Sequence, residues 1–143
     1  MRPTIDRPSQ RSSWAVLAVI AAGGVLGACA RHGAALAWPH RTGEFPWATL
    51  GVNVSGCLLI GVLMVLITEV WAAHPLIRPF LGTGVLGGYT TFSTYTVDVA
   101  QLVAAGAVGP GLGYLAGTLA AALAAVYAGS TGTRLVAARL RRP

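Results

Sequence analysis

Long apolar segments bounded by tryptophan restrict this chain to a membrane environment. Residues 14–38 and 47–71 each begin and end with tryptophan, and two further apolar stretches cover about residues 80–105 and 109–129. At about 1.5 Å per residue, a helix of such length crosses a hydrocarbon core of about 30 Å. Tryptophan is enriched at both bilayer surfaces. The sequence therefore predicts an all-α membrane protein with four transmembrane helices per subunit.

The composition excludes disorder and argues against a water-soluble fold. Hydrophobic residues make up 55% of the chain and charged residues 10%, with a mean hydropathy of +0.66. An ordinary soluble domain carries about 25% charged residues. We expect one four-helix domain over residues 14–130, a basic N-terminal tail over 1–13 and an arginine-rich C-terminal tail over 131–143. The first apolar run is too long for the apolar region of a signal peptide.

The arginines predict how the chain is oriented. The net charge is +6, lysine is absent, and the arginines flank the apolar stretches rather than cluster on one face, so no nucleic-acid partner is predicted. Eight of the ten lie in the two tails and the segment between the second and third stretches. Only Arg31 and Arg41 fall on the other side. Because cytoplasmic flanks are rich in arginine, both termini are predicted in the cytoplasm, with the chain in the cell membrane.

Small residues recur at helical spacing in two of the apolar stretches. Residues 109, 113 and 117 are glycine and residue 121 is alanine, and the first stretch has a shorter version in Gly23 and Gly27. Such stripes let another helix backbone approach closely. They predict a compact bundle with a partner chain.

Polar side chains inside the apolar stretches mark the candidate site, because hydrocarbon offers them no partner. Thr49 and Asn53 are four residues apart on one helical face, and Tyr114 and Thr118 share that spacing. Each pair is open to two interpretations, an interhelical hydrogen bond or a track for a transported species.

The third stretch encodes a regular helix poorly. Four glycines precede a run of hydroxyl and aromatic side chains between residues 82 and 98, which predicts a break near residues 87–93. Freed carbonyl groups can hold a cation and freed N–H groups an anion, although a packing kink without a ligand fits the pattern as well. Phe92 and Tyr95 are three residues apart, and their electropositive ring edges suit a small anion in a water-poor pathway.

Three segments resemble the signature segments of the CrcB/Fluc fluoride channels: GGVLGACARH at 23–32, ATLGVNVSGCLLIG at 48–61 and GVLGGYTTFSTYTVD at 84–98. The resemblance covers about residues 14–130. It implies an antiparallel, dual-topology dimer in the lipid bilayer, in which the third helix of each subunit is broken at mid-membrane. It also implies passive export of fluoride from the cytoplasm, and no enzymatic activity.

The resemblance assigns roles to particular residues of this chain. The fluoride pathway it implies comprises Phe92, Tyr95, Asn53, Thr49, Tyr114, Thr118 and Ser93, with Arg31 in the vestibule. Backbone carbonyls of Gly87 and Thr90 fall where the family holds a structural sodium ion, Na+, that is not transported. Tyr95 stands where phenylalanine is usual and adds a hydroxyl group that could donate to fluoride. Asp98, Cys57 and His32 stand where glutamate, serine and tyrosine are frequent.

The arginine bias leaves the partner subunit open. An antiparallel homodimer requires one sequence to insert in both orientations, whereas eight arginines against two favour one of them. We therefore expect either a homodimer or a heterodimer with an oppositely oriented paralogue.

Two other functional classes compete with the channel. A small four-helix multidrug exporter would need a carboxylate in the first span, which residues 14–38 lack, and a non-transporting assembly subunit would leave the polar pairs unexplained. An enzyme is disfavoured because Ser93 has no histidine in any span interior to activate it.

Overall fold

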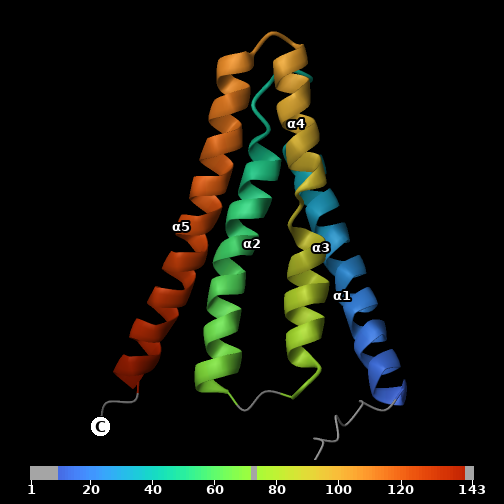
Figure 1. The fold of residues 1–143 in the computed structure, drawn as a ribbon, viewed down its shortest axis with the longest axis vertical. Helices are drawn as coiled ribbons and strands as arrows, with labels where there is room; N and C mark the ends of the chain where they lie inside the picture. The colour runs from blue at the N-terminus through green and yellow to red at the C-terminus, as the bar shows by residue number, and fades with distance from the viewer. Residues whose placement is uncertain (1–9, 72–73, 141–143) are drawn as a thin grey trace, which may run out of the picture.

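The computed structural model describes residues 10–71 and 74–140, and every regular element within these ranges is helical. The chain forms neighbouring columns that run between two ends of the molecule (Figure 1). In chain order the elements are α1 (Gln10–Ala37), α2 (Trp47–Val65), the π-helical η1 (Leu66–Val70) and η2 (Arg78–Leu86), α3 (Gly87–Tyr89), α4 (Ser93–Ala104) and α5 (Val108–Leu140).

Three of the described helices are long and apolar enough to cross a membrane: Ser13–Ala37, Trp47–Val70 and Val108–Leu140. The third predicted span is not a continuous helix. It consists of η2, α3 and α4, which follow one another along a column that is interrupted at residues 90–92. The break predicted near residues 87–93 is therefore confirmed, and it is narrower than predicted.

The last helix continues past its predicted end at residue 129. α5 runs for 33 residues to Leu140, which corresponds to about 50 Å and exceeds the hydrocarbon thickness. Arg134 anchors this extension, because its Nε and Nη2 atoms each lie 2.9 Å from Oε1 of Glu69 on η1. The predictions for residues 1–9 and 141–143, including four of the ten arginines, lie outside the described residues.

Glycine brings α1 directly against the backbone of η2 and α3. A Cβ atom on Gly27 would overlap the carbonyl oxygen of Val85, and one on Gly23 would lie 2.5 Å from the carbonyl oxygen of Phe80. The close helix packing predicted for Gly23 and Gly27 is therefore confirmed. α2 and α5 approach in the same way, since a Cβ atom on Gly129 would overlap the carbonyl oxygen of Leu58.

The glycine stripe on α5 makes no such contact within the subunit. A Cβ atom on Gly109, Gly113 or Gly117 would meet no atom within 4 Å among the described residues. α5 instead packs on α4 near Gly111, where an added Cβ atom would lie 3.2 Å from Cγ2 of Val103. The close approach predicted for the stripe is thus not made within the part of the chain that the structure describes.

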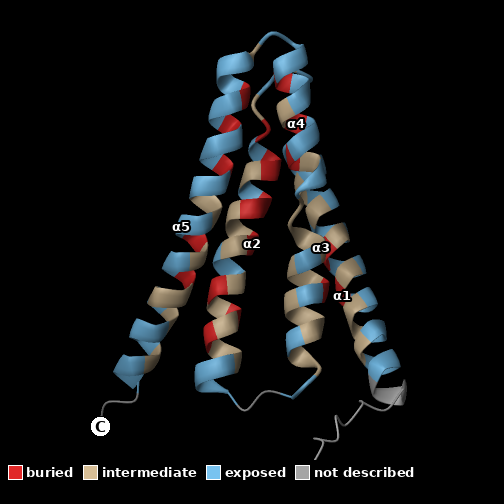
Figure 2. Cartoon of the chain, in the orientation of Figure 1, coloured by how far each residue is buried: buried red, intermediate tan, exposed pale blue. Residues whose placement is uncertain are grey.

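Buried residues lie on the inward faces of the columns, and exposed residues cover their outer sides (Figure 2). Tyr95, Leu102 and Tyr114 form a small core where α4 meets α5, and the turn between these helices uses Gly106 at a φ of +82°. All four tryptophans are more than half exposed. This outward apolar surface suits lipid, as the sequence predicts.

The glycine contacts lead to a first prediction. Gly27→Ala should lower the stability of the fold by about 1–3 kcal/mol, because α1 must move away from Val85 to admit the methyl group. The midpoint of thermal unfolding in detergent measures the effect. Gly33→Ala is the matched control, because a Cβ atom there meets open space. Equal midpoints for the two variants would contradict the close backbone contact.

Candidate functional site

Asn53 on α2 bonds to the backbone at the break in the third column. Its Nδ2 donates to the carbonyl oxygen of Thr91 at 2.9 Å, and its Oδ1 accepts from the N–H of Thr91 at 2.8 Å. Asn53 is buried in α2, with 8% of its surface exposed. The structure thus contains the interhelical hydrogen bond that was one interpretation of this residue. One amide side chain satisfies both backbone groups at the centre of the break.

The hydroxyl group of Thr91 caps the N-terminal turn of α4. Its Oγ1 accepts from the N–H of Thr94 at 3.1 Å and donates to Oγ1 of Thr94 at 3.0 Å. Ser93, which is exposed at the first position of α4, lies 3.4 Å from the same hydroxyl group. The Thr91 side chain therefore replaces a helical carbonyl group as the acceptor for the first turn of α4.

These hydrogen bonds release two carbonyl groups from the helical pattern. In a continuous α-helix, the N–H of Thr91 would bond to the carbonyl of Gly87, and the N–H of Thr94 to that of Thr90. Both N–H groups bond to side chains instead. The two released carbonyls belong to the residues that the sequence resemblance assigns to sodium.

An open groove lies along the break on the side of α5. Its volume is about 610 Å³. The Phe92 ring is 77% exposed beside it, and the ring centroids of Phe92 and Tyr95 lie 5.7 Å apart. We call this the pore groove; it is lined by Asn53, Cys57, Thr90, Thr91, Phe92, Tyr95, Leu115, Ala116, Thr118, Leu119 and Ala122.

Thr118 brings an uncommitted hydroxyl group to the pore groove. The residue is only 4% exposed, and its Oγ1 has no hydrogen-bond partner among the described residues. A buried polar atom without a partner is costly, and each instance calls for an explanation such as a ligand or a water molecule. Thr118 lines the groove, and its buried hydroxyl oxygen is the polar atom at this wall that still lacks a partner.

The extra hydroxyl group of Tyr95 is already engaged. It donates to the carbonyl oxygen of Leu115 on α5, so the donation to fluoride expected from the sequence would compete with this bond. Tyr114 lies behind Tyr95, with ring centroids 5.4 Å apart, and is 1% exposed. Its hydroxyl group donates to Oδ2 of Asp98 at 3.3 Å. Of the predicted pair on α5, only Thr118 lines the groove.

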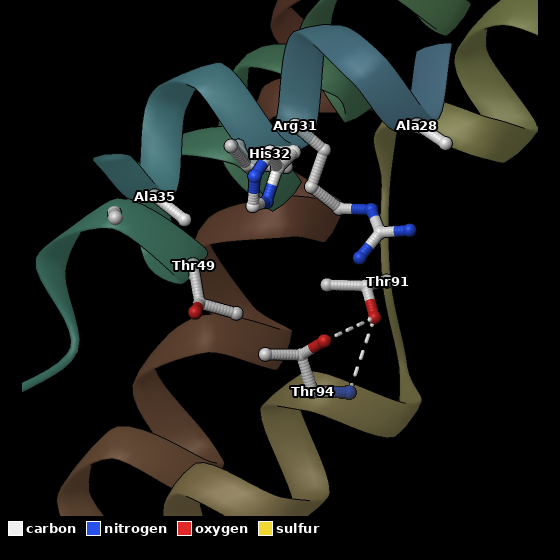
Figure 3. Close-up of a pocket in the computed structure, with 9 residues that line it drawn as sticks. Ala28, Arg31, His32, Ala35, Thr49, Thr91 and Thr94 are labelled. Carbon is white, nitrogen blue, oxygen red and sulfur yellow. Dashed lines mark hydrogen bonds between the residues drawn. The ribbon is translucent and has the colours of Figure 1, made fainter. Parts of the chain in front are cut away.

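Arg31 and Thr49 line a second recess on the α1 side of the break. This recess, the arginine pocket, has a volume of about 220 Å³. In Figure 3 the side chain of Arg31 extends toward Thr91, whose hydroxyl group points down to Thr94. Nε of Arg31 donates to the carbonyl oxygen of Gly88 at 3.2 Å. The full lining is Ala28, Arg31, His32, Ala35, Ala48, Thr49, Val52, Thr91 and Thr94.

Of the predicted site residues, Asn53, Thr90, Phe92, Tyr95 and Thr118 line the pore groove, and Arg31 and Thr49 line the arginine pocket. Ser93, Tyr114 and Gly87 line neither recess, whereas Thr91 lines both. Sequence reasoning missed Thr91 and Thr94 as individual residues. Their spacing of three in a hydroxyl-rich run was the available signal, because a threonine just before a helix can accept from its first N–H groups. Sequence reasoning also missed that Nε2 of His40 lies 3.8 Å from Oδ1 of Asp98, a pairing for which the sequence holds no local signal.

Long apolar helices around a broken, polar column define a multi-pass helical membrane protein. Residues 18–130 match the family described as CrcB-like protein, Camphor Resistance (CrcB). The chain belongs to this family, as its sequence segments indicated.

Several curated relatives carry names that state a function. The chain is 59% identical over 114 residues to "Fluoride-specific ion channel FluC 2" of Streptomyces avermitilis, a match that covers 77% of this chain and 72% of that protein. It is 56% identical to "Fluoride-specific ion channel FluC 1" of Streptomyces coelicolor over 92% of this chain and 85% of the relative. A third relative, "Fluoride-specific ion channel FluC 2" of Nocardia farcinica, is 52% identical, with 90% and 91% covered. These names describe ion channels and not enzymes.

The two hydrogen bonds between Asn53 and Thr91, which we call the Asn53 clamp, give a second prediction. Asn53→Ala should cost about 1–3 kcal/mol, because it leaves both backbone groups of Thr91 without a partner in an apolar setting. Asn53→Asp should also destabilise the break, because a carboxylate cannot donate to the Thr91 carbonyl. Hydrogen exchange followed by mass spectrometry should show faster exchange over residues 90–93 in both variants.

Thr133→Val is a suitable control for these variants. The hydroxyl group of Thr133 donates to the carbonyl of Gly129 within its own helix, away from the break. This variant should leave exchange over residues 90–93 unchanged. Unchanged exchange in Asn53→Ala as well would show that the clamp does not hold the break.

Proposed function

We propose that this chain forms a fluoride-selective channel that lets fluoride leave the cytoplasm passively and so reduces its toxicity. Membership of the CrcB family and the names of its relatives support fluoride as the permeating ion. The observation that carries the proposal is the pore groove, where the exposed Phe92 ring and the unpartnered Thr118 hydroxyl group flank the Asn53 clamp.

The chemistry of the pore groove suits weak binding of a small anion. Aromatic ring edges are electropositive, and a free hydroxyl group can donate a hydrogen bond, so both can replace part of the hydration shell of fluoride. Neither carries a full charge that would trap the ion, and conduction requires sites that an ion can leave. Arg31 supplies the full positive charge outside the groove, in the arginine pocket, where it can attract anions.

The outward direction follows from the membrane potential. A cell interior that is negative drives a monovalent anion outward by about 2.3 kcal/mol per 100 mV. A passive channel then exports fluoride without coupling to protons. This distinguishes it from a small multidrug exporter, for which α1 contributes no carboxylate. No feature of the groove favours a non-transporting assembly subunit.

We further propose that two subunits pair in antiparallel orientation, each crossing the membrane four times. The exposed Phe92 ring and the uncontacted stripe of Gly109, Gly113 and Gly117 support this, since both offer surface that a second helical subunit can cover. The broken column of η2, α3 and α4 is the third crossing. With eight arginines on the side of the termini, the chain inserts with both termini in the cytoplasm and pairs with itself or with an oppositely oriented paralogue.

A structural sodium ion fits the released carbonyl groups of Gly87 and Thr90. Carbonyl oxygens are hard ligands, and two from each subunit would give a sodium ion four ligands. Among the residues that the structure describes, no group of three or more His, Cys, Asp or Glu side chains could hold a metal ion. The carbonyl groups freed at the break are the proposed donors, and a bound ion would offset their partial negative charge.

The groove residues generate a third prediction, on fluoride flux. The purified chain in liposomes should release fluoride, measured with a fluoride electrode, and should release no chloride. Phe92→Ile, which removes the ring edges, should slow the flux about tenfold or more, equivalent to about 1.4 kcal/mol of barrier height. Thr118→Val, which keeps the side-chain shape but removes the hydroxyl group, should slow it as well.

The matched control for the hydroxyl group is Thr68→Val. The hydroxyl group of Thr68 on η1 bonds to the carbonyl of Met64 near the end of α2, and Thr68 does not line the groove, so this variant should conduct like the native chain. Fluoride flux from the single chain would mean that it assembles both orientations. Flux that requires the paralogue would indicate a heterodimer. Absence of fluoride flux both from the chain alone and from the chain with the paralogue would reject the channel.

Sodium removal provides a fourth prediction. When Na+ is replaced by N-methylglucamine during purification and assay, the thermal unfolding midpoint and the fluoride flux should both fall, because the proposed carbonyl ligands lose the bound cation. Thr90→Ser should keep this dependence, since the ion binds the backbone carbonyl and not the side chain. An unfolding midpoint that is indifferent to Na+ would count against the site.

A further inference from the structure

A histidine outside the helices pairs with a buried carboxylate inside them. Nε2 of His40, in the connection between α1 and α2, lies 3.8 Å from Oδ1 of Asp98. Asp98 is 5% exposed on α4, while the side chain of His40 is 29% exposed and so can exchange protons with water. The other carboxylate oxygen accepts the hydrogen bond from Tyr114.

The carboxylate of Asp98 lies behind the wall of the pore groove. Tyr95, which lines the groove, precedes Asp98 by three residues on α4 and so shares its helical face. The Tyr95 ring packs against the ring of Tyr114, whose hydroxyl group binds Asp98. A negative charge in this low-dielectric setting opposes the entry of an anion into the groove.

Few other charges face this pair among the described residues. In the connection between α1 and α2, Glu44 lines the same surface recess as His40, and its Oε2 accepts from the backbone N–H of Arg41 at 3.0 Å. α4 contributes Asp98 and Tyr95, and α5 contributes Tyr114. Of these residue types, histidine is the one whose charge ordinarily changes between about pH 5 and pH 8.

We propose that His40 regulates fluoride conduction by setting the net charge beside the pore groove. Protonated His40 offsets the Asp98 carboxylate, which lowers the barrier to fluoride; neutral His40 leaves that negative charge uncompensated. His40 is a positioning residue that acts through Asp98 and does not touch the ion. The inference rests on the proposed fluoride channel, and it adds a pH dependence of conduction within the physiological range.

The pH profile of fluoride flux tests this role. Liposomes containing the chain should release fluoride about threefold or more faster at about pH 6 than at about pH 8, because one charge near a low-dielectric path is switched. His40→Arg, which stays charged, should conduct at the faster rate at both values. His40→Gln, which stays neutral, should conduct at the slower rate at both.

Two controls isolate the effect. His74→Gln should keep the native pH profile, because His74 lies in the connection before η2 and its Nδ1 accepts from the N–H of Leu76. Protein-free liposomes at each pH correct for leakage of hydrogen fluoride. A native pH profile in His40→Gln, or a native chain whose flux ignores pH, would overturn the proposal.

A second measurement does not depend on flux. Unfolding midpoints of His40→Gln, Asp98→Asn and the double variant should be non-additive at about pH 6 and additive at about pH 8, since the attraction requires the imidazolium. Additive midpoints at both values would reject the ion pair itself. Non-additivity in a chain that conducts no fluoride would keep the ion pair but reject the proposed function, and with it the role in conduction.

Discussion

The two hydrogen bonds between Asn53 and Thr91 are the interaction on which the rest of the structure depends. Backbone groups that leave a helix at membrane depth find no water, so a break survives only where protein supplies their partners. Asn53 supplies both partners from a neighbouring helix. The exposure of Phe92, the release of the Gly87 and Thr90 carbonyls and the new start of α4 at Ser93 all follow from a break held at Thr91.

Close backbone contact holds the clamp in place. Lipid tails are as apolar as leucine, so helices in a membrane gain little from hydrophobic burial and associate through close packing. Gly27 allows α1 to touch the backbone of η2 and α3, which brings Arg31 within 3.2 Å of the Gly88 carbonyl. Gly129 brings α5 against α2 in the same way, and Asn53 of α2 and Thr118 of α5 both line the groove. Small residues therefore position the polar ones.

No charged side chain is among the described residues that line the pore groove. The guanidinium group of Arg31 lies in the arginine pocket, and the carboxylate of Asp98 lies behind the tyrosines. Thr91 separates the arginine pocket from the groove and lines both. Under the proposed channel function, the hydroxyl groups and ring edges of the groove are weaker partners for an anion than Arg31 is. Weak partners favour passage over retention.

Local patterns in the sequence determined the apolar helices, the break within residues 87–93, the close packing at Gly27 and the family, because hydropathy, glycine content and motif spacing are read along the chain. They left the partners of polar atoms undecided. An asparagine in an apolar helix requires a partner, but only the packing of α2 against the broken column decides that it is Thr91. The same holds for the bond from Tyr95 to Leu115, for His40 beside Asp98 and for the outward-facing glycine stripe of α5. Each depends on how helices distant in sequence are rotated and placed against one another, which periodicity within a single helix does not specify.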